Sequence, residues 1–583
     1  MSGISLASWT LAAVAGFLLL RAIRARLLLS RAKHRSLQGH PRLAKRLARL
    51  LPFYEFDEQR FFDSDGAPDD IVTRRRSGFA RLADLFERRS PTTLSYHRMA
   101  ASIPDLRFTN AYRVPFQYRS HVAKNLRVDP VVQASSGVRV QDLDESWSYD
   151  LTGSYGVNLF GYDFYKECID AGVECVRELG PVLGPYHPVI EDNVRWLKAM
   201  SGLDDVSFHM SGTEAVMQAV RLARFHTGRS HVVRFAGAYH GWWDDVQPGP
   251  GNPADARATY TLKEMDPLTL RVLETRRDIA CVLVNPIQCL HPNSGAPSDG
   301  TLVGSGRSAQ FDRHAYTRWL KALRDVCSRR AIVLIFDEIF VGFRIARGGA
   351  QEYFGVRADM VTYGKTVGGG LPVGVVCGRA DLMKRYRDDR PSDICFARGT
   401  FNSHPYVMGA MHEFLRRFDQ PAVRATYETL ERTWEARVES LNERLAHERL
   451  PICIENLVSI WTVIYTTPSR YNWMFQYYLR AEGLALSWVG TGRLVFSHNF
   501  SDEDMAVVCD RFVAAARAMR DDGWWSELPA LTDRAIRWQL ARELAAAIIS
   551  RGSHRGAPRI HAASSDTIGS NSSPLSRYSG DFP

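Results

Sequence analysis

The sequence predicts an α/β fold with a mainly parallel central sheet from about Trp147 onward. Strand-like stretches alternate with helical ones across short glycine-rich junctions, which is the pattern of a parallel sheet with helical crossovers. Most strand-like stretches are short apolar runs, as expected for strands that are buried on both faces. The candidate central strands are Val206–His209, His231–Phe235, Ile279–Val284, Ala331–Phe336, Met360–Thr362 and Val373–Cys377.

The chain has 583 residues, which is too long for one compact core and indicates several domains. A smaller α+β domain is expected after the large one, and the last residues are rich in Ser, Gly and Pro, which favours disorder. The expected segments are a membrane anchor with a basic amphipathic helix (1–51), a linker or N-terminal extension (52–135), a cofactor-binding large domain (136–415), a small C-terminal domain (416–550) and a disordered tail (551–583).

Charge and cysteine content exclude two classes of protein. The net charge of +10 comes from arginines and lysines that crowd residues 21–49 and 74–89, so it does not predict a nucleic-acid-binding face. The nine cysteines are scattered, odd in number and without Cys-x-x-Cys spacing. This pattern favours reduced thiols in the cytosol and argues against a disulfide framework or a zinc site.

The N-terminus predicts a membrane anchor. Ile4–Leu20 carries no charge, and a basic flank begins at Arg21. Such a stretch is at the short end of what spans a bilayer, and the flank predicts that the catalytic domain is cytoplasmic. An amphipathic surface helix that continues through Arg42–Leu51 is expected to add contact with anionic lipid. The alternative is a soluble helix docked on the protein itself.

Lys365 is the first candidate for chemistry. It stands between a strand-like run and a cluster of glycines in Val361–Gly374. Glycines fit where the backbone must approach a bound group closely. Lysine forms Schiff bases with carbonyl compounds when burial or a nearby cation lowers its pKa. A solvated lysine in a turn gives the same short pattern, so other motifs must decide.

Three further motifs follow other strands. Ser211, Gly212 and Thr213 open a helix and offer N–H groups and hydroxyls to a phosphate, although an ordinary helix cap reads the same way. Asp337 ends a very apolar strand, at the sheet edge where ligands bind, and a protonated pyridine nitrogen would partner it. Tyr239 is suited to stacking on a flat ring. A capping aspartate and a core tyrosine are the alternatives.

Together these motifs predict pyridoxal 5′-phosphate as the cofactor. Tyr239 stacks on its ring, Asp337 meets the ring cation, Gly212 and Thr213 hold the phosphate, and Lys365 captures the carbonyl.

From roughly residue 147 to 520 the chain resembles the class III aminotransferases of fold type I. It is most similar to glutamate-1-semialdehyde aminomutase and to polyketide-associated aminotransferase domains. The resemblance implies that Lys365 is the Schiff-base lysine and Asp337 its pyridine partner, and that the protein is an enzyme of this class. The residues that carry it are Ile335–Arg344, Gly348–Gly355, Ala358–Asp359 and Gly364–Lys365.

The same resemblance implies the remaining cofactor contacts. Tyr239 falls at the stacking aromatic with His240 beside it, and Gln288 lies near the phenolic oxygen of the cofactor. Thr400 matches a threonine that reaches the phosphate of the neighbouring subunit, which implies a homodimer with shared active sites. Ser211, Gly212 and Thr213 match the phosphate loop.

Departures from the family pattern concern the substrate. Asn285–Leu290 stands where many members have Glu-Pro-Ile-Gln-Gly-Glu, so both glutamates are missing. In ω-aminotransferases the second glutamate screens an arginine, which Arg493 resembles. Arg493 is then expected to bind the carboxylate of an amino-acid donor, unless it is a solvent-facing strand residue. Tyr155 is expected to line the substrate entrance.

These features predict transfer of an amino group from an amino-acid donor to a lipophilic aldehyde, ketone or acyl carbonyl, as in lipid or natural-product synthesis. A membrane anchor favours such an acceptor. One alternative is intramolecular amino transfer, as in glutamate-1-semialdehyde 2,1-aminomutase. An inactive membrane-tethered scaffold is another, against which the intact Lys365, Asp337 and Thr213 argue. No metal and no nucleic-acid partner is expected.

Overall fold

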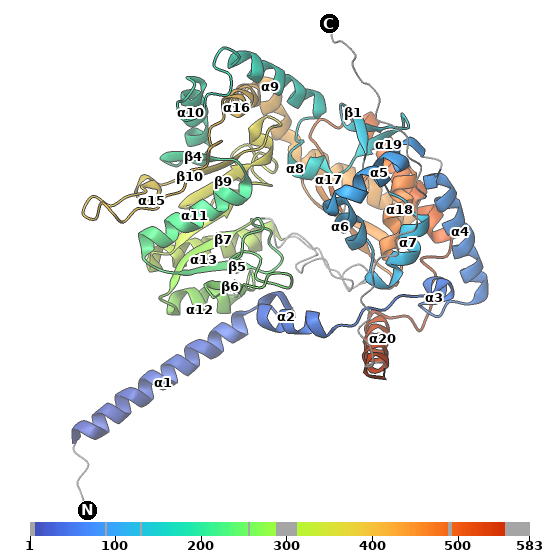
Figure 1. Ribbon diagram of the computed structural model, residues 1–583, viewed down its shortest axis with the longest axis horizontal. Coiled ribbons are helices and arrows are strands. Elements are labelled where there is room, and N and C mark those ends of the chain that lie inside the picture. The colour runs from blue at the N-terminus through green and yellow to red at the C-terminus, as the bar shows by residue number, and fades with distance from the viewer. Residues whose placement is uncertain are drawn as a thin grey trace, which may run out of the picture.

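The computed structural model describes residues 6–35, 37–87, 90–128, 131–254, 257–286, 312–487 and 492–553. These residues form two lobes, one around a central sheet and one around smaller antiparallel strands and helices (Figure 1). The predicted tail at 551–583 lies outside the described residues from 554 onward.

The central sheet has seven strands in the order β4-β10-β9-β8-β7-β5-β6. The strands from β9 to β6 are parallel, and β10 runs antiparallel to both of its neighbours. This confirms the predicted α/β fold with a mainly parallel sheet, and each predicted strand is present; β6 was not predicted. The strands are β4 Asp205–His209, β5 His231–Phe235, β6 Thr259–Leu262, β7 Ile279–Val284, β8 Val333–Asp337, β9 Met360–Gly364 and β10 Gly374–Gly378.

Helices cover both faces of this sheet because its middle strands are apolar on both sides. Every residue of β7, β8 and β9 is buried. Apolar residues of α11 (Gly212–Thr227) pack on one face, and those of α12 (Pro267–Thr275) and α13 (Arg313–Arg330) belong to the core on the other. The remaining helices of this lobe are α9 Tyr162–Cys175, α10 Val189–Ser201, α14 Gly349–Phe354, α15 Ala380–Met383 and α16 Pro405–Phe418. The short element α8 (Gly153–Gly156) has non-helical backbone angles at Ser154 and Tyr155 and lies next to the second lobe (Figure 1).

The second lobe is built on a three-stranded antiparallel sheet. Its strands are β11 Ile452–Leu457, β12 Ile460–Tyr465 and β14 Arg493–Val495, and every residue of β12 is buried. A further sheet joins β1 Val132–Ser136, β2 Arg139–Asp142 and β3 Trp147–Asp150 to β13 Leu484–Ala485. The helices of the C-terminal part are α17 Pro421–His447, α18 Phe475–Ala481, α19 Asp502–Asp521 and α20 Asp533–Ser553.

Residues 52–135 share the core of this second lobe. Arg75 is fully buried, donates to both carboxylate oxygens of Asp65 at 2.7–2.8 Å and lies over the ring of Tyr471. Phe61 packs edge-to-face against Trp524. The helices of this segment are α3 Glu58–Asp63, α4 Asp69–Glu87, α5 Ser90–Ser102, α6 Pro104–Tyr112 and α7 Arg119–Asn125.

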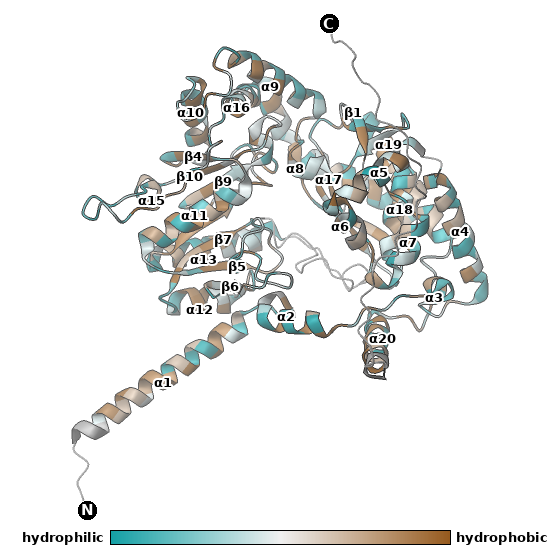
Figure 2. Ribbon diagram, in the orientation of Figure 1, coloured by the Kyte–Doolittle hydropathy of each residue, from teal (hydrophilic) through white to brown (hydrophobic). Residues whose placement is uncertain are grey.

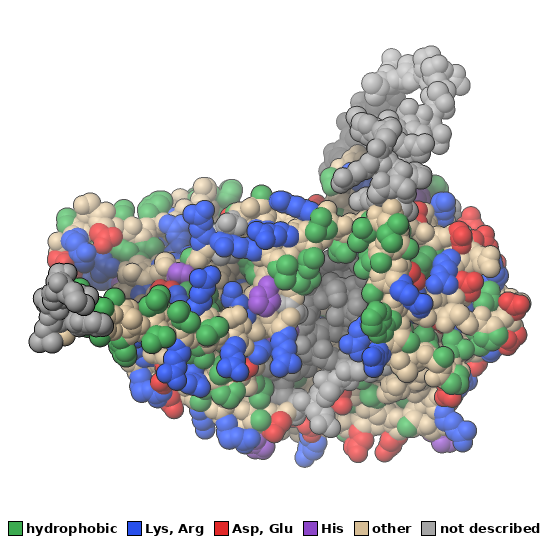
Figure 3. Space-filling view, turned by 90° about the horizontal axis from the view of Figure 1, so that it is seen from below, with side chains coloured by type: hydrophobic (Ala, Val, Ile, Leu, Met, Phe, Trp, Pro, Cys, Tyr) green, Lys and Arg blue, Asp and Glu red, His purple; other side chains and the backbone are tan. Residues whose placement is uncertain are grey.

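The N-terminus projects from the molecule as a helix, α1 (Leu6–Ala32), followed by α2 (Pro41–Leu50) (Figure 1). The end of α1 joins the large lobe, where the N–H of Lys263 donates to the carbonyl of Ala32 at 3.0 Å. Its first half is apolar and its second half is interrupted by charge (Figure 2). Lys and Arg side chains are interleaved with hydrophobic ones on the face seen from below (Figure 3).

The prediction of a membrane-spanning N-terminal helix needs correction. Within the residues that the structure describes, no helix is both long enough and apolar enough to cross a membrane. The physical reason is that Arg21, Arg24 and Arg26 follow one another on α1. Residues 1–54 contain ten Lys and Arg and no Asp or Glu, so this segment accounts for the whole net charge of +10.

Candidate active site

The predicted cofactor residues meet at the carboxyl edge of the central sheet. Lys365 directly follows β9 and Asp337 ends β8. Ser211 follows β4, and Tyr239 comes four residues after the end of β5. Because these strands all run in the same direction, their ends lie along one edge, where open α/β sheets bind ligands.

Lys365 carries a reactive amine. The residue is partly buried and its backbone adopts a left-handed conformation, with φ of 51°. Burial lowers the pKa of its amine to about 8, the Asp337 carboxylate opposes this shift, and the Arg344 guanidinium adds to it. A lysine with such a pKa is partly deprotonated near neutral pH, as a nucleophile must be.

Asp337 is fixed by three donors. Its Oδ2 accepts from His240 Nδ1 at 2.6 Å, and its Oδ1 accepts from the N–H of Ile339 at 3.2 Å and from the hydroxyl of Thr362 at 3.5 Å. Asp337 and His240 are 2% and 1% exposed. Burial lowers the pKa of His240, so a neutral imidazole donates this bond. Nε2 of His240 is buried and has no partner within the described part of the chain.

The ring of Tyr239 is exposed to solvent beside the buried Asp337–His240 pair. The residue is 62% exposed, and burial of its hydroxyl, followed by the charge of Asp337, raises its pKa. An exposed ring beside a buried carboxylate leaves a face available for stacking on a flat aromatic group.

The predicted phosphate loop begins α11, a helix of 16 residues. Ser211 is its N-cap and accepts from the N–H of Glu214 at 3.3 Å, so capping and the supply of free N–H groups coincide here. Gly241, with φ of 88°, occupies a position that requires glycine, and Gly212 lies close to a side chain that a Cβ atom would displace. A Cβ atom on Gly212 would lie 2.7 Å from Ile339, and one on Gly241 would lie 2.6 Å from the hydroxyl of Thr213.

A strained loop closes one side of the site. Residues 153–156 all have positive φ values of 52°, 45°, 57° and 94°. Tyr155 in this loop is 54% exposed. A Cβ atom on Gly156 would lie 2.6 Å from the ring of Phe340 and 3.5 Å from Cδ of Lys365, so the loop backbone packs directly on the reactive lysine.

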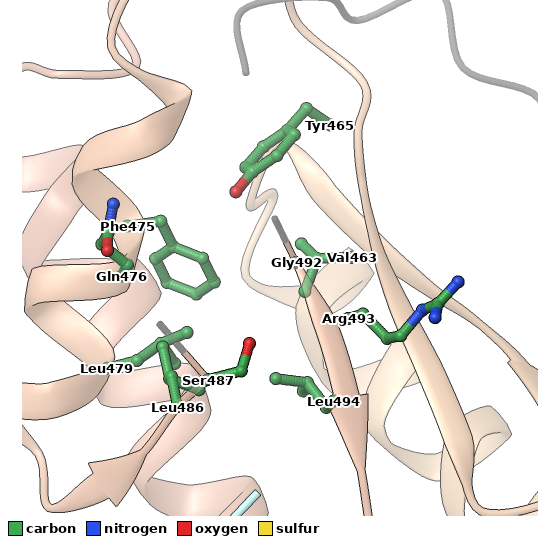
Figure 4. Close-up of a pocket in the computed structure, with 10 residues that line it drawn as sticks. All are labelled: Val463, Tyr465, Phe475, Gln476, Leu479, Leu486, Ser487, Gly492, Arg493 and Leu494. Atoms are coloured by element: carbon green, nitrogen blue, oxygen red, sulfur yellow. The ribbon is translucent and has the colours of Figure 1, made fainter. Parts of the chain in front are cut away.

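Arg493 begins β14, and its guanidinium lies 6.0 Å from the ring centroid of Phe340. Burial alone lowers its pKa to about 10, and no carboxylate pairs with it among the described residues. Figure 4 shows its side chain pointing away from a small pocket between β14 and α18. The amine of Lys365 lies 4.7 Å from the centroid of the same Phe340 ring.

For two predicted residues the structure shows no contact that tests the prediction. Gln288 falls within 287–311, outside the described residues. Thr400 is exposed on the segment between α15 and α16. Its predicted contact is with a neighbouring subunit and stays a prediction.

Sequence reasoning missed Phe340 and Arg344 as site residues. Phe340 is the ring that Lys365, Arg344 and Arg493 all approach, with guanidinium or amine atoms 4.7–6.0 Å from its centroid. The run from Ile335 to Arg344 could have indicated Arg344, because an arginine buried close to an apolar strand needs hydrogen-bond acceptors within the protein.

Taken together, the residues present fit pyridoxal 5′-phosphate. A partly deprotonated amine, a buried carboxylate, an exposed aromatic ring and a glycine-lined helix N-terminus converge on one sheet edge. These are the groups that a carbonyl, a pyridine nitrogen, a flat ring and a phosphate require.

Comparison with known proteins agrees with this arrangement. The family model "Aminotransferase class-III" matches residues 121–245 and 308–516. The glutamate-1-semialdehyde 2,1-aminomutase of Citrifermentans bemidjiense is 30% identical over 413 residues, which cover 65% of this chain and 90% of that protein. The aminomutase of the same name from Methanothermobacter thermautotrophicus is 34% identical over 315 residues, covering 50% of this chain and 68% of that protein.

Solved structures share the fold. A structure described as a transaminase with PLP bound is 26% identical, has a TM-score of 0.56, and covers 67% of this chain and 92% of its own. A glutamate-1-semialdehyde aminomutase from Pseudomonas aeruginosa PAO1 has a TM-score of 0.61 at 17% identity, covering 77% of this chain and 99% of its own.

The lowered pKa of Lys365 gives a pH-dependent prediction. In full-length protein freed of cofactor, labelling of Lys365 by a small amine-reactive probe should become half-maximal near pH 8, because the amine loses its proton there. An ordinary lysine requires about pH 10.4. Mass spectrometry of the labelled peptides gives the profile, with the exposed Lys198 as internal control.

The variant Asp337→Asn should lower the Lys365 midpoint further, since the carboxylate favours the protonated amine. A midpoint near pH 10 in the wild-type protein, or an upward shift in Asp337→Asn, contradicts this account of the site.

Proposed function

The chain belongs to the class III aminotransferases and is a pyridoxal-phosphate-dependent enzyme of that type, and from this premise we propose that it transfers an amino group from an amino-acid donor to a lipophilic aldehyde, ketone or acyl carbonyl. The observation that carries the proposal is the partly deprotonated Lys365 beside buried Asp337, with aromatic and unpaired cationic groups around them.

Each residue of the site has a task in this reaction. When bound, the cofactor supplies a pyridine ring that accepts electrons from the carbon next to the amino group. The amine of Lys365 would hold the cofactor covalently and would move a proton at that carbon. Asp337 would hold the ring nitrogen in its cationic form, Tyr239 would stack on the ring, and the N-terminus of α11 would bind the phosphate.

The surroundings of Arg493 support the proposal that the donor is an amino acid. Its guanidinium has no acidic partner among the described residues, and it lies on the same phenylalanine ring as Lys365. A carboxylate bound there would balance the charge of this half-buried cation through a charge-assisted hydrogen bond.

The aromatic surroundings support a lipophilic acceptor. Phe340 contacts Lys365, and the loop that carries Tyr155 packs on Phe340. Tyr239 and Trp242 are 62% and 73% exposed next to the buried Asp337–His240 pair. Aromatic side chains contribute apolar surface to a substrate pocket, which supports an acceptor with an apolar group.

Intramolecular amino transfer is the second candidate. The relatives quoted above carry the name glutamate-1-semialdehyde 2,1-aminomutase at 30–34% identity. An aminomutase moves the amino group within one molecule and consumes no external donor, so the origin of the nitrogen separates the two functions.

A ¹⁵N-labelled donor tests the proposed function. Incubated with a ¹⁵N-amino acid and a long-chain aldehyde or ketone, the enzyme should produce the corresponding ¹⁵N-amine, detected by mass spectrometry. Lys365→Ala should reduce the rate by a factor of about a hundred or more, because it removes the group that moves the proton. Isomerisation of an amino-carbonyl substrate without uptake of the label would favour the aminomutase.

Arg493→Gln should raise the KM for amino-acid donors roughly ten- to hundredfold, as expected for a lost hydrogen bond between charged groups. The KM for an amine donor without a carboxylate should change little, because such a donor makes no contact that needs the guanidinium. Steady-state kinetics with both donors gives the comparison. Arg444→Gln, a substitution of an arginine paired with Asp510 on α19, is the matched control. Equal effects on both donors would exclude the role.

A homodimer with shared active sites is part of the proposal. Phe396, Phe401 and Ile394 are 68%, 50% and 56% exposed on the segment that also carries Thr400. Exposed apolar side chains gathered on one segment mark protein interfaces.

Sedimentation should give a mass near twice 65.8 kDa, and Thr400→Val should weaken cofactor binding without dissociating the dimer. A monomer at micromolar concentration contradicts shared sites.

A further inference from the structure

We propose that Arg344 is a positioning residue of the active site. Its buried guanidinium holds residues 153–158, here called the entrance loop, against the second lobe and supplies a fixed positive charge near Lys365. The entrance loop includes the strained residues 153–156. The inference concerns the same site and rests on the role proposed for Lys365. It assigns a task to a residue that touches no substrate.

Arg344 joins two parts of the chain that are more than 300 residues apart. The residue is 1% exposed. Its Nη2 donates to the carbonyls of Asn158 at 3.2 Å and Gly156 at 3.5 Å, in the entrance loop. Its Nη1 donates to the carbonyl of Phe496 at 2.7 Å and to the hydroxyl of Ser459 at 3.1 Å, in the second lobe.

No carboxylate neutralises this guanidinium. Within the described residues Arg344 makes no ion pair, and burial lowers its pKa to about 10. Tyr165, Tyr427 and Asp150 act on it only at longer range. Transferring a cation from water into the protein interior costs several kcal/mol, and here no ion pair offsets that cost, although four hydrogen bonds do so in part. The charge of Arg344 is therefore better explained by the site than by the stability of the fold.

The loop that Arg344 holds is strained. Ser154 and Tyr155 adopt left-handed conformations, which cost about 1–2 kcal/mol for each non-glycine residue. At its start the loop is fixed through Thr152, which donates to Asp150. At its end the carbonyls of Gly156 and Asn158 are fixed by Arg344. Without the arginine the strain is free to relax away from Phe340.

The same guanidinium acts on Lys365 through its charge. It lies 5.7 Å from the centroid of the Phe340 ring that the lysine amine also contacts. Of the charged groups that face the amine, Asp337 raises its pKa and Arg344 lowers it, and Arg493 stands on the same ring. A permanent cation at this place favours the neutral, nucleophilic amine.

Two variants separate the geometric task from the electrostatic one. Arg344→Lys keeps the charge but has no planar fork to reach four acceptors. Arg344→Met removes both charge and donors while keeping an apolar stem. Arg424→Met is the control, because Arg424 is a half-exposed arginine paired with Asp419.

Two readouts are measured on the full-length protein. Hydrogen–deuterium exchange of residues 153–158 in the holoenzyme should rise about tenfold in both Arg344 variants. The pH midpoint of Lys365 labelling, after removal of the cofactor, should rise by roughly one unit in Arg344→Met. It should stay near 8 in Arg344→Lys. The control should match the wild type in both.

The outcomes that overturn the proposal are distinct. If hydrogen–deuterium exchange of residues 153–158 is unchanged in both variants, Arg344 does not hold the loop. If the pH midpoint of Lys365 labelling rises equally in Arg344→Lys and Arg344→Met, the charge of Arg344 does not set the pKa of Lys365. If Arg344→Met fails to fold, Arg344→Gln gives the same charge-free measurement with two donors retained. Neither readout uses a substrate, so failure of the proposed amino transfer would leave this test intact.

Discussion

The active site holds three basic side chains close together in apolar surroundings, and no acidic side chain pairs with any of them among the described residues. Lys365, Arg344 and Arg493 surround one ring, that of Phe340, and Asp337 is the carboxylate that acts on the lysine. Buried cations of this kind are costly when they lack partners. Backbone carbonyls of the loop at 153–158 and of the second lobe therefore accept hydrogen bonds from Arg344, and the N-terminus of α11 adds further positive potential to this sheet edge.

Backbone carbonyl groups, rather than acidic side chains, accept most of the hydrogen bonds of the buried Arg344. Arg344 is satisfied by carbonyl groups from the entrance loop and from the second lobe. The loop keeps a left-handed course through Ser154 and Tyr155 that isolated residues of these types avoid. Both lobes consequently contribute to the surroundings of one amine, although neither contributes an acidic side chain near Arg493 in the part of the chain that is described.

Most of the sheet and of the cofactor site follows from local sequence, and the reason is physical. A polar residue at the end of an otherwise apolar strand, such as Asp337 or Lys365, has few places to go except a site at the sheet edge. β6 has only four residues and an alternating polar pattern, so it gives little signal. Arg344 was missed because its acceptors lie at Gly156, Ser459 and Phe496, far away in sequence. The predicted membrane span at Ile4–Leu20 is wrong for the described residues, because α1 begins at Leu6 there and its apolar part ends before Arg21, which is too short to cross a membrane.

The register of the central sheet has a consequence for how the site tolerates change. Gly364, which precedes the lysine, pairs with Gly374, and Gly374 pairs with His209, two residues before Ser211. Adjacent strands are about 4.8 Å apart, so the backbone hydrogen bonds of the sheet alone set roughly 10 Å between Gly364 and His209, the residues that precede the lysine and the phosphate loop. Substitutions of side chains around these strands leave this spacing unchanged. One inserted residue in β4, β9 or β10, by contrast, shifts the strand register, changes the distance between the two anchors and turns every side chain beyond it to the opposite face of the sheet.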